Sequence, residues 1–174
     1  MAVSDPKLRR NRSTAFIIAF LVFVFDQATK WVVTYPLNLA GQPDRKIPIT
    51  DFFNLKWVEN TGVSLGLLSA DSAMGRWLLV ALTAAIALFV AVWLWRERRR
   101  DDSTALALIL GGALGNIADR SRFGYVVDFA DLHFGDWRPF LVFNVGDAAI
   151  TIGVLLLLVR ALLMRDGKAS KKDA

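Results

Sequence analysis

The sequence contains no cysteine and only one histidine, His133, among its 174 residues. These absences exclude a cysteine nucleophile, a disulfide scaffold and any metal site built from several cysteine or histidine ligands. His133 lies between Asp131 and Asp136, a setting typical of a solvated loop. We therefore expect no metal site, and chemistry that uses carboxylates, hydroxyls, amides and cations.

Apolar residues are abundant, at 55% of the chain, and the mean hydropathy is +0.41. A small soluble fold tolerates less apolar surface than this, so a bilayer is the expected solvent. The net charge of +5 is compatible with nucleic-acid binding, but the basic residues lie beside apolar stretches and not along one soluble face. We expect a membrane protein with no nucleic-acid partner.

Four apolar segments are long enough to cross a hydrocarbon core of ~30 Å, which takes ~20 helical residues. We expect membrane helices at about 14–35, 77–95, 104–120 and 141–164. The third has the shortest apolar part and runs into Asn116, Asp119 and Arg120, so its end requires a shielded polar environment. No internal repeat is visible, which predicts that residues 1–174 form a single membrane domain.

Lysine and arginine residues near the helix ends predict the orientation of the chain. They cluster in the N-terminal arm, in the connection after the second helix and in the tail, namely Lys7, Arg9, Arg10, Arg12, Arg96, Arg98, Arg99, Arg100, Arg165, Lys168, Lys171 and Lys172. All three regions, and hence both termini, are predicted to be cytoplasmic. The segments 36–76 and 121–140 are then predicted to lie outside.

The first outer segment, 36–76, is more than a simple connection. Its run 47–57 is rich in β-branched and aromatic residues, and the turn-forming Asn60, Thr61 and Gly62 follow. This pattern predicts a small β-rich platform, whereas 121–140 is expected to be an outer loop. The predicted fold class is all-α integral membrane, with four transmembrane helices and a small β-rich extracytoplasmic platform.

Polar side chains interrupt the apolar segments, although each ionisable group there costs at least ~2.5 to 3.5 kcal/mol on insertion scales. Asp26 and Lys30 are four residues apart, so they share a helix face and can pair. A simple ion pair that neutralises its own cost is one explanation of these two. Similar spacings join two further pairs near the outer ends of the third and fourth helices, Asn116 with Arg120 and Asn144 with Asp147.

The predicted topology collects these polar groups in one layer near the outer leaflet, and places Asp128 in the adjacent outer connection. Two carboxylates held close together cannot both ionise easily, so one of them retains a proton near neutral pH. Aspartic proteases use this arrangement, in which the charged carboxylate activates water and the protonated one donates to the scissile carbonyl. Periodicity alone leaves open which two aspartates meet.

Five motifs occur in order along the chain: DQATK at Asp26–Lys30, NTG at Asn60–Gly62, GGALGNIADR at Gly111–Arg120, VDF at Val127–Phe129 and FNVGD at Phe143–Asp147. In these motifs, and over nearly its whole length, the chain resembles the lipoprotein signal peptidase family, also called signal peptidase II. Two departures stand out. The family usually has alanine where Gly146 stands, and alanine and phenylalanine are common where residues 63–65 stand.

The resemblance implies an intramembrane aspartic endopeptidase that acts without a cofactor. Its implied substrate is a diacylglyceryl-modified bacterial prolipoprotein, cut just before the lipidated cysteine. Asp128 and Asp147 correspond to the catalytic pair, which activates water and donates a proton. The residues implied to surround that pair or to bind substrate are Asp26, Lys30, Asn60, Gly62, Asn116, Arg120 and Asn144.

The same resemblance implies a multi-pass protein of the bacterial cytoplasmic (inner) membrane, with its active site near the outer leaflet. The expected partners are the lipid-modified prolipoprotein and membrane lipid, and we expect the chain to act as a monomer. A small ion-coupled membrane transporter is the alternative, but it predicts polar groups at the midplane or through the full membrane depth. A membrane scaffold that only binds partners gives no reason for aspartates flanked by asparagines.

Overall fold

The computed structural model describes residues 6–62 and 73–169. The described residues form α1 (Pro6–Thr34), two short 3-10 turns (Leu39–Gly41 and Pro43–Arg45), β1 (Lys46–Thr50), β2 (Phe53–Asn60), α2 (Ala73–Arg96), α3 (Arg100–Phe123), β3 (Val126–Leu132) and α4 (Val145–Ala169). Part of the predicted platform, 63–72, including the departure at 63–65, and the end of the basic tail lie outside the described residues.

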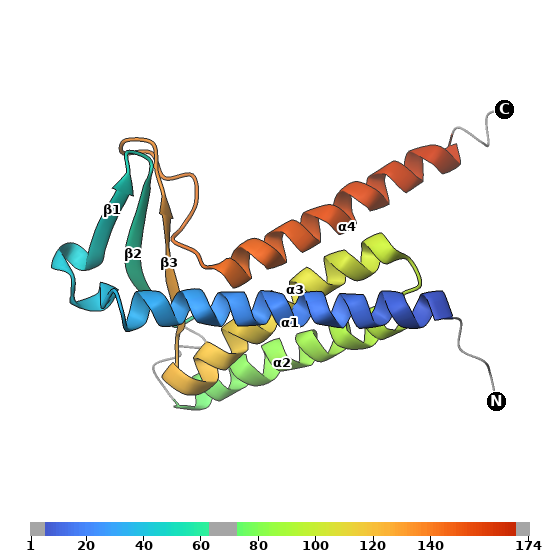
Figure 1. Cartoon of the computed structure of the whole chain (residues 1–174), viewed down its shortest axis with the longest axis horizontal. Helices are drawn as coiled ribbons and strands as arrows, with labels where there is room; N and C mark the ends of the chain where they lie inside the picture. Colours follow the sequence, from blue (N-terminus) through green and yellow to red (C-terminus); the bar gives the residue numbers. More distant parts are fainter. Residues whose placement is uncertain (1–5, 63–72, 170–174) are drawn as a thin grey trace.

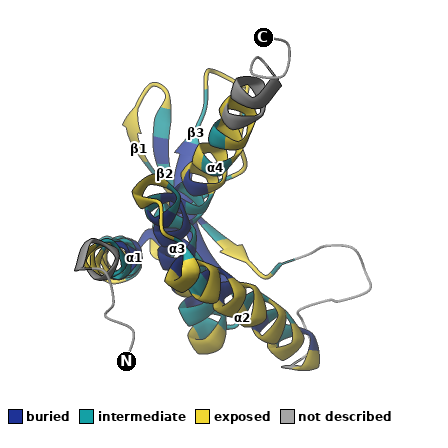
Figure 2. Cartoon of the chain, turned by 90° about the vertical axis from the view of Figure 1, so that its right-hand side faces the viewer, coloured by how far each residue is buried: buried dark blue, intermediate teal, exposed yellow. Residues whose placement is uncertain are grey.

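Helix α3 lies at the centre of the molecule and packs against α1, α2 and α4 (Figure 2). Its glycines allow this close packing. A Cβ at Gly111 would lie 2.5 Å from the backbone oxygen of Ala19 in α1, and one at Gly112 would lie 2.3 Å from the backbone oxygen of Gly146 in α4. The small residues of α3 therefore let two neighbouring helices approach backbone to backbone.

The other three helices carry the apolar surface. By length and composition, α1, α2 and α4 are each able to cross a membrane, and only about a fifth of each apolar stretch is buried inside the structure. In Figure 2 the exposed surface covers much of α2 and α4, whereas α3 carries many of the buried residues. The predicted fold class is confirmed as four helices, three of them apolar spans, with one small antiparallel sheet.

The sheet lies at one end of the helical bundle, and the first turns of α1 and the last turns of α4 lie at the other end (Figure 1). Its strand order is β1-β2-β3, with both pairs antiparallel. A cluster of buried apolar side chains, including Val33, Leu39, Trp57 and Phe129, packs the sheet against the end of α1. The platform is thus attached to the helix that carries the DQATK motif.

Strand β3 lies within the segment 121–140, where the sequence predicted only an outer loop. The strand is buried along almost its whole length, so its sequence lacks the alternation of apolar and polar residues that marks a half-exposed strand. It also contains Asp128 and Asp131, both buried. The platform therefore combines two segments that are distant in the sequence, and its third strand carries the VDF motif.

Two helix boundaries differ from the expected ones for identifiable reasons. Helix α4 begins at Val145 and not near residue 141, because Phe143 exchanges two backbone hydrogen bonds with Ala130 of β3, at 3.1 and 2.8 Å. Helix α1 begins at Pro6 and not near residue 14, because the basic arm is also helical. Apolarity marks where a helix enters the bilayer, which is a different position from where the helix begins.

Candidate active site

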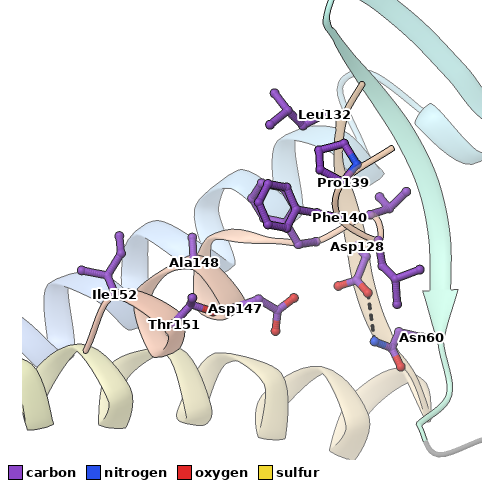
Figure 3. A pocket seen from close by; sticks show the side chains of 12 residues that line it. Asn60, Asp128, Leu132, Pro139, Phe140, Asp147, Ala148, Thr151 and Ile152 are labelled. Carbon is purple, nitrogen blue, oxygen red and sulfur yellow. Dashed lines mark hydrogen bonds between the residues drawn. The ribbon is translucent and has the colours of Figure 1, made fainter. Parts of the chain in front are cut away.

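A pocket of about 640 Å³ opens between β3, the connection 133–144 and the first turns of α4. Its lining residues are Asn60, Asp128, Leu132, Pro139, Phe140, Leu141, Val142, Phe143, Asp147, Ala148, Thr151 and Ile152. Most are apolar, and the two acids among them are Asp128 and Asp147. Figure 3 shows both carboxylates pointing into the pocket, one from β3 and the other from α4.

Asp128 is 2% exposed and accepts two amide hydrogen bonds. Asn60 Nδ2 donates to its Oδ2 at 3.0 Å, and Asn144 Nδ2 donates to its Oδ1 at 2.6 Å. Burial and the neighbouring charge of Asp147 raise the pKa of Asp128 to about 6, against the opposing effect of the two amides. Asp128 therefore holds a proton more readily than an ordinary aspartate does.

Asp147 lies in the first turn of α4 and is paired reciprocally with Asn144, the residue directly before that helix. Asp147 N donates to Asn144 Oδ1 at 2.9 Å, and Asn144 N donates to Asp147 Oδ2 at 3.2 Å. This exchange has the pattern of a capping box, which satisfies backbone donors at a helix start. Asn116 Nδ2 of α3 donates to the other carboxylate oxygen at 2.8 Å.

Three buried charged residues, Asp26, Lys30 and Asp119, form an ionic group next to the two pocket aspartates. Lys30 Nζ contacts Asp26 Oδ2 at 2.8 Å, Asp119 Oδ2 at 2.9 Å and Asn116 Oδ1 at 3.0 Å. The pair of Asp26 and Lys30 suggested by their spacing is thus formed, at 0% and 4% exposure. It is more than a self-contained pair, because Asn116 links it directly to Asp147.

Arg120 lies on α3 within electrostatic reach of Asp147, Asp128 and Asp119. Its buried Nε has no hydrogen-bond partner among the described residues. The guanidinium therefore has an N–H group that can donate a hydrogen bond to a molecule bound in the pocket. A planar guanidinium suits carbonyl or carboxylate oxygens, because its N–H groups form a rigid fork.

Gly62 acts on the site through Asn60. Its φ of 99° is in the region that L-residues with a side chain rarely adopt, and its N–H donates to Asn60 Oδ1 at 3.0 Å. This turn leaves Asn60 Nδ2 directed at Asp128. The structure therefore brings all nine predicted site residues together around one pocket.

Two further residues, Gln27 and Asp119, belong to the polar network around the pocket, although the sequence did not predict them as site residues. Gln27 Nε2 donates to Asp119 Oδ1 at 2.9 Å, and Asp119 Oδ2 accepts the backbone N–H of Val127 at 3.1 Å. The signal that could have found Asp119 is its three-residue spacing from Asn116, which places both side chains on one face of α3.

His133 lies apart from the aspartate pair, directly after the end of β3 and beside Asn54 of β2. Its Nε2 is 2.7 Å from Asn54 Nδ2, and Asn54 also donates to Asp131, which pairs with Arg138. Among the described residues no group of three or more potential ligands is arranged to hold a metal ion. The residues around the pocket can instead exchange protons between two carboxylates and a bound water.

The family model described as signal peptidase (SPase) II matches residues 18–163. The chain belongs to this family. Among its relatives is the lipoprotein signal peptidase of Sphingopyxis alaskensis, 58% identical over 158 residues, which cover 91% of this chain and 90% of that one. That of Rhizorhabdus wittichii is 56% identical over 163 residues, which cover 94% of each chain.

The fold also matches a solved structure, a bacterial membrane enzyme determined by the in meso method. The TM-score is 0.74 and the sequence identity 28%, with 90% of this chain and 92% of that chain covered. Membership in the signal peptidase II family confirms the predicted activity, that of a lipoprotein signal peptidase acting as an aspartic endopeptidase. It also confirms the resemblance inferred from the five motifs.

The departure from the family pattern at Gly146 has a structural explanation. A Cβ at this position would lie 2.9 Å from the backbone oxygen of Gly112 and 3.2 Å from Asp26 Oδ1. Gly146 also donates its N–H to Asp26 Oδ1 at 2.8 Å. Glycine therefore permits a closer contact of α4 with α3 and with Asp26 than alanine would at the same backbone separation.

Proposed function

We propose that this signal peptidase removes the signal peptide from diacylglyceryl-modified bacterial prolipoproteins, cutting just before the lipidated cysteine, with Asp128 and Asp147 as its catalytic pair. One observation carries the proposal. Carboxylates from two separate elements point into one largely apolar pocket and are joined through Asn144. An apolar wall around two acids suits a peptide bond carried by an apolar, lipid-bearing chain.

The raised pKa of Asp128, about 6, favours Asp128 as the carboxyl that holds the shared proton. The charge of Asp147 is stabilised by donors from Asn116 and Asn144 and by the N-terminal end of the α4 dipole. We assign water activation to Asp147. In this scheme Asp147 takes a proton from water as the water oxygen bonds to the scissile carbonyl carbon.

Asp128 donates its hydrogen bond to the carbonyl oxygen as negative charge develops there. When the carbon–nitrogen bond breaks, Asp128 gives its proton to the leaving amine and the proton that Asp147 took from water replaces it, so the products are a carboxyl end and a free amine and the pair again holds one proton. Arg120 is free to hold a substrate carbonyl beside the reacting bond. In this proposal Asp26, Lys30, Asn60, Gly62, Asn116 and Asn144 keep the pair in place, and no cofactor takes part.

We also propose that the active site faces the outer leaflet of the bacterial inner membrane. The start of α1 and the end of α2 lie at the bundle end opposite the sheet (Figure 1), and exposed arginines occur there, including Arg10, Arg96 and Arg98. Positive residues concentrate on the cytoplasmic side of membrane proteins. This distribution supports an orientation with both termini inside and the sheet outside. A monomer is sufficient, because one chain supplies every residue of the proposed site.

The test is cleavage of a diacylglyceryl-modified prolipoprotein by the purified full chain in detergent. Wild type is compared with Asp128→Asn and Asp147→Asn, and thermal unfolding verifies that each variant is folded. We expect each variant to lose ~10³-fold or more in kcat, as when a reacting group is removed. Asp136→Asn, an exposed acid outside the pocket, is the matched control and retains wild-type kcat.

Two outcomes contradict the proposal. Cleavage by either folded pocket variant at near wild-type rate would show that the assigned pair is wrong. A folded wild type that does not cut the lipid-modified substrate, while it cuts an unmodified signal peptide, would show that the lipid is not part of what this protein recognises.

A further inference from the structure

Each proposed catalytic aspartate directly follows a residue whose backbone N–H is held by a different buried carboxylate. Asp119 Oδ2 accepts from Val127, the residue before Asp128, at 3.1 Å. Asp26 Oδ1 accepts from Gly146, the residue before Asp147, at 2.8 Å. The two supporting carboxylates thus act on the backbone of β3 and α4 at equivalent positions.

Lys30 joins these two supports. Its Nζ lies 2.8 Å from Asp26 Oδ2 and 2.9 Å from Asp119 Oδ2, and its third contact is Asn116 Oδ1 at 3.0 Å. The three contacts match the three donors of an ammonium group. The exposed fractions are 0% for Asp26, 4% for Lys30 and 1% for Asp119. Water therefore does not compete for these bonds.

A simple helix–helix ion pair does not account for this arrangement. Neutralising Lys30 takes one carboxylate, and Asp26 supplies it from the same helix. A second carboxylate leaves the three-residue group with excess negative charge, which is expensive to bury unless further donors compensate. Asp119 finds those donors in Gln27 and in the Val127 N–H. Arg120 also lies within electrostatic reach of Asp119 and contributes to the charge balance, but only the bond to the Val127 N–H connects Asp119 to β3.

We infer that Asp26, Lys30 and Asp119 form a buried clamp that fixes β3 and α4 relative to each other, and that Asp119 is a positioning residue for peptide-bond cleavage. The clamp acts through the backbone N–H groups of Val127 and Gly146. The inference rests on the proposed function, because it requires Asp128 and Asp147 to be the reacting pair. It adds a role for a residue that touches neither pocket nor substrate.

Asp119→Asn is the direct test. An amide has one acceptor oxygen, whereas three donors converge on the Asp119 carboxylate, so at least one of them loses its partner. A small misplacement of reacting groups costs up to ~10²-fold in rate. We expect kcat per folded molecule to fall ~10- to 100-fold, with KM changed by less than ~3-fold, because the substrate-binding wall is untouched.

Asp102→Asn is the matched control. Asp102 also lies on α3 and pairs with an arginine of α4, Arg160, at 2.8 Å, but at the end of α3 remote from the pocket. The same chemical change there removes a helix–helix ion pair without touching β3 or the start of α4. We expect a modest loss in the thermal unfolding midpoint and an unchanged kcat.

A double-mutant cycle tests the shared connection through Lys30. Asp26→Asn and Asp119→Asn should each lower kcat, and the double variant should lose little more than the worse single variant, since both act on one clamp. Should Asp119→Asn fail to fold, Gln27→Met serves in its place. It removes one donor to Asp119 and is expected to lower kcat about threefold to tenfold, by the same misplacement on a smaller scale.

Three results would overturn the clamp: a wild-type kcat per folded Asp119→Asn or Gln27→Met molecule, losses in the double variant that multiply, or an equal fall in kcat for Asp102→Asn. The proposed function is tested separately. If Asp128→Asn and Asp147→Asn are inactive while Asp119→Asn cleaves normally, only the clamp is wrong. If the two pocket variants cleave, the proposed function itself is wrong.

Discussion

The side-chain amide of Asn144 donates a hydrogen bond of 2.6 Å to Oδ1 of Asp128. The same side chain accepts the backbone N–H of Asp147 through its oxygen, at 2.9 Å. Asn144 thus bonds to Asp128 on β3 and caps the first turn of α4, the helix that carries Asp147. A rotation of this side chain would break both contacts, so the orientation of one aspartate is coupled to that of the other.

The pH profile follows from the proton on Asp128, whose pKa is raised to about 6. Cleavage that needs protonated Asp128 should decline in kcat/KM as pH rises through about 6, because the free enzyme then loses that proton. The hydrogen bond from Asn60 lowers this pKa. Removing it in Asn60→Ala should therefore move the decline to higher pH.

Steady-state kinetics across the pH range measure this shift. Asn54→Ala is the control, because Asn54 donates to Asp131 and not to Asp128. Its profile should keep the wild-type midpoint even if its stability is lower. A decline in Asn60→Ala at the wild-type pH would show that the proton on Asp128 does not limit the reaction.

Gly115 allows α3 to pack closely against Asp26 of α1. A Cβ at Gly115 would lie 2.2 Å from Asp26 Oδ2. Gly115→Ala should therefore displace Asp26, lower the free energy of unfolding by ~1 to 3 kcal/mol as overpacking does, and reduce kcat. Thermal unfolding and kcat measure the two effects. Leu114→Ala, at a 40% exposed neighbouring position, should leave kcat unchanged.

The connection 133–144 is secured to the sheet by an ion pair. Arg138 pairs with Asp131, which is 1% exposed and also accepts from Asn54 at 3.3 Å. Burial alone would raise the pKa of Asp131, but these hydrogen bonds outweigh it and hold the pKa below the ordinary value. Asp131 therefore stays charged down to low pH, and the pair is lost only as pH falls through that depressed pKa.

Breaking this pair should loosen the wall of the pocket formed by Pro139 to Phe143. Arg138→Gln is expected to raise KM ~3- to 10-fold with little change in kcat, and to increase proteolysis within the connection. Arg122→Gln, an exposed arginine over the ring of Phe123, is the control. Equal KM values in the two variants would exclude a role for the pair in substrate binding.

Leu141 is 90% exposed and lines the pocket, so its apolar surface is available to substrate. Burying a leucine side chain contributes ~1.5 to 3 kcal/mol, which corresponds to about tenfold or more in binding. Leu141→Ser should therefore raise KM by about that factor without lowering stability. Phe52→Ser, in the exposed turn between β1 and β2, should leave KM unchanged. An unchanged KM in Leu141→Ser would exclude contact with substrate.

The helices and the pair of Asp26 and Lys30 were predictable because their signals are local, whereas the pairing of Asp128 with Asp147 was expected only from the resemblance to the family. Twenty apolar residues indicate a span wherever they occur, and the spacing of Asp26 and Lys30 gives their shared face. Strand β3 was not predictable, because burial on both faces removes the alternation that identifies a strand. The role of Asp119 was also hidden, since its partner Gln27 is 92 residues away in the sequence.

The hydrogen bond from Gly146 to Asp26 joins residues 120 positions apart, in the last and the first helix. During synthesis the first helix must enter the bilayer long before its partner in the fourth exists. The contact between Asp26 and Lys30 within α1 provides an internal counter-ion for that interval. Because Asp147 and Gly146 lie in the last helix, we expect the site to form only after that helix has been synthesised, and a chain truncated before α4 to be inactive.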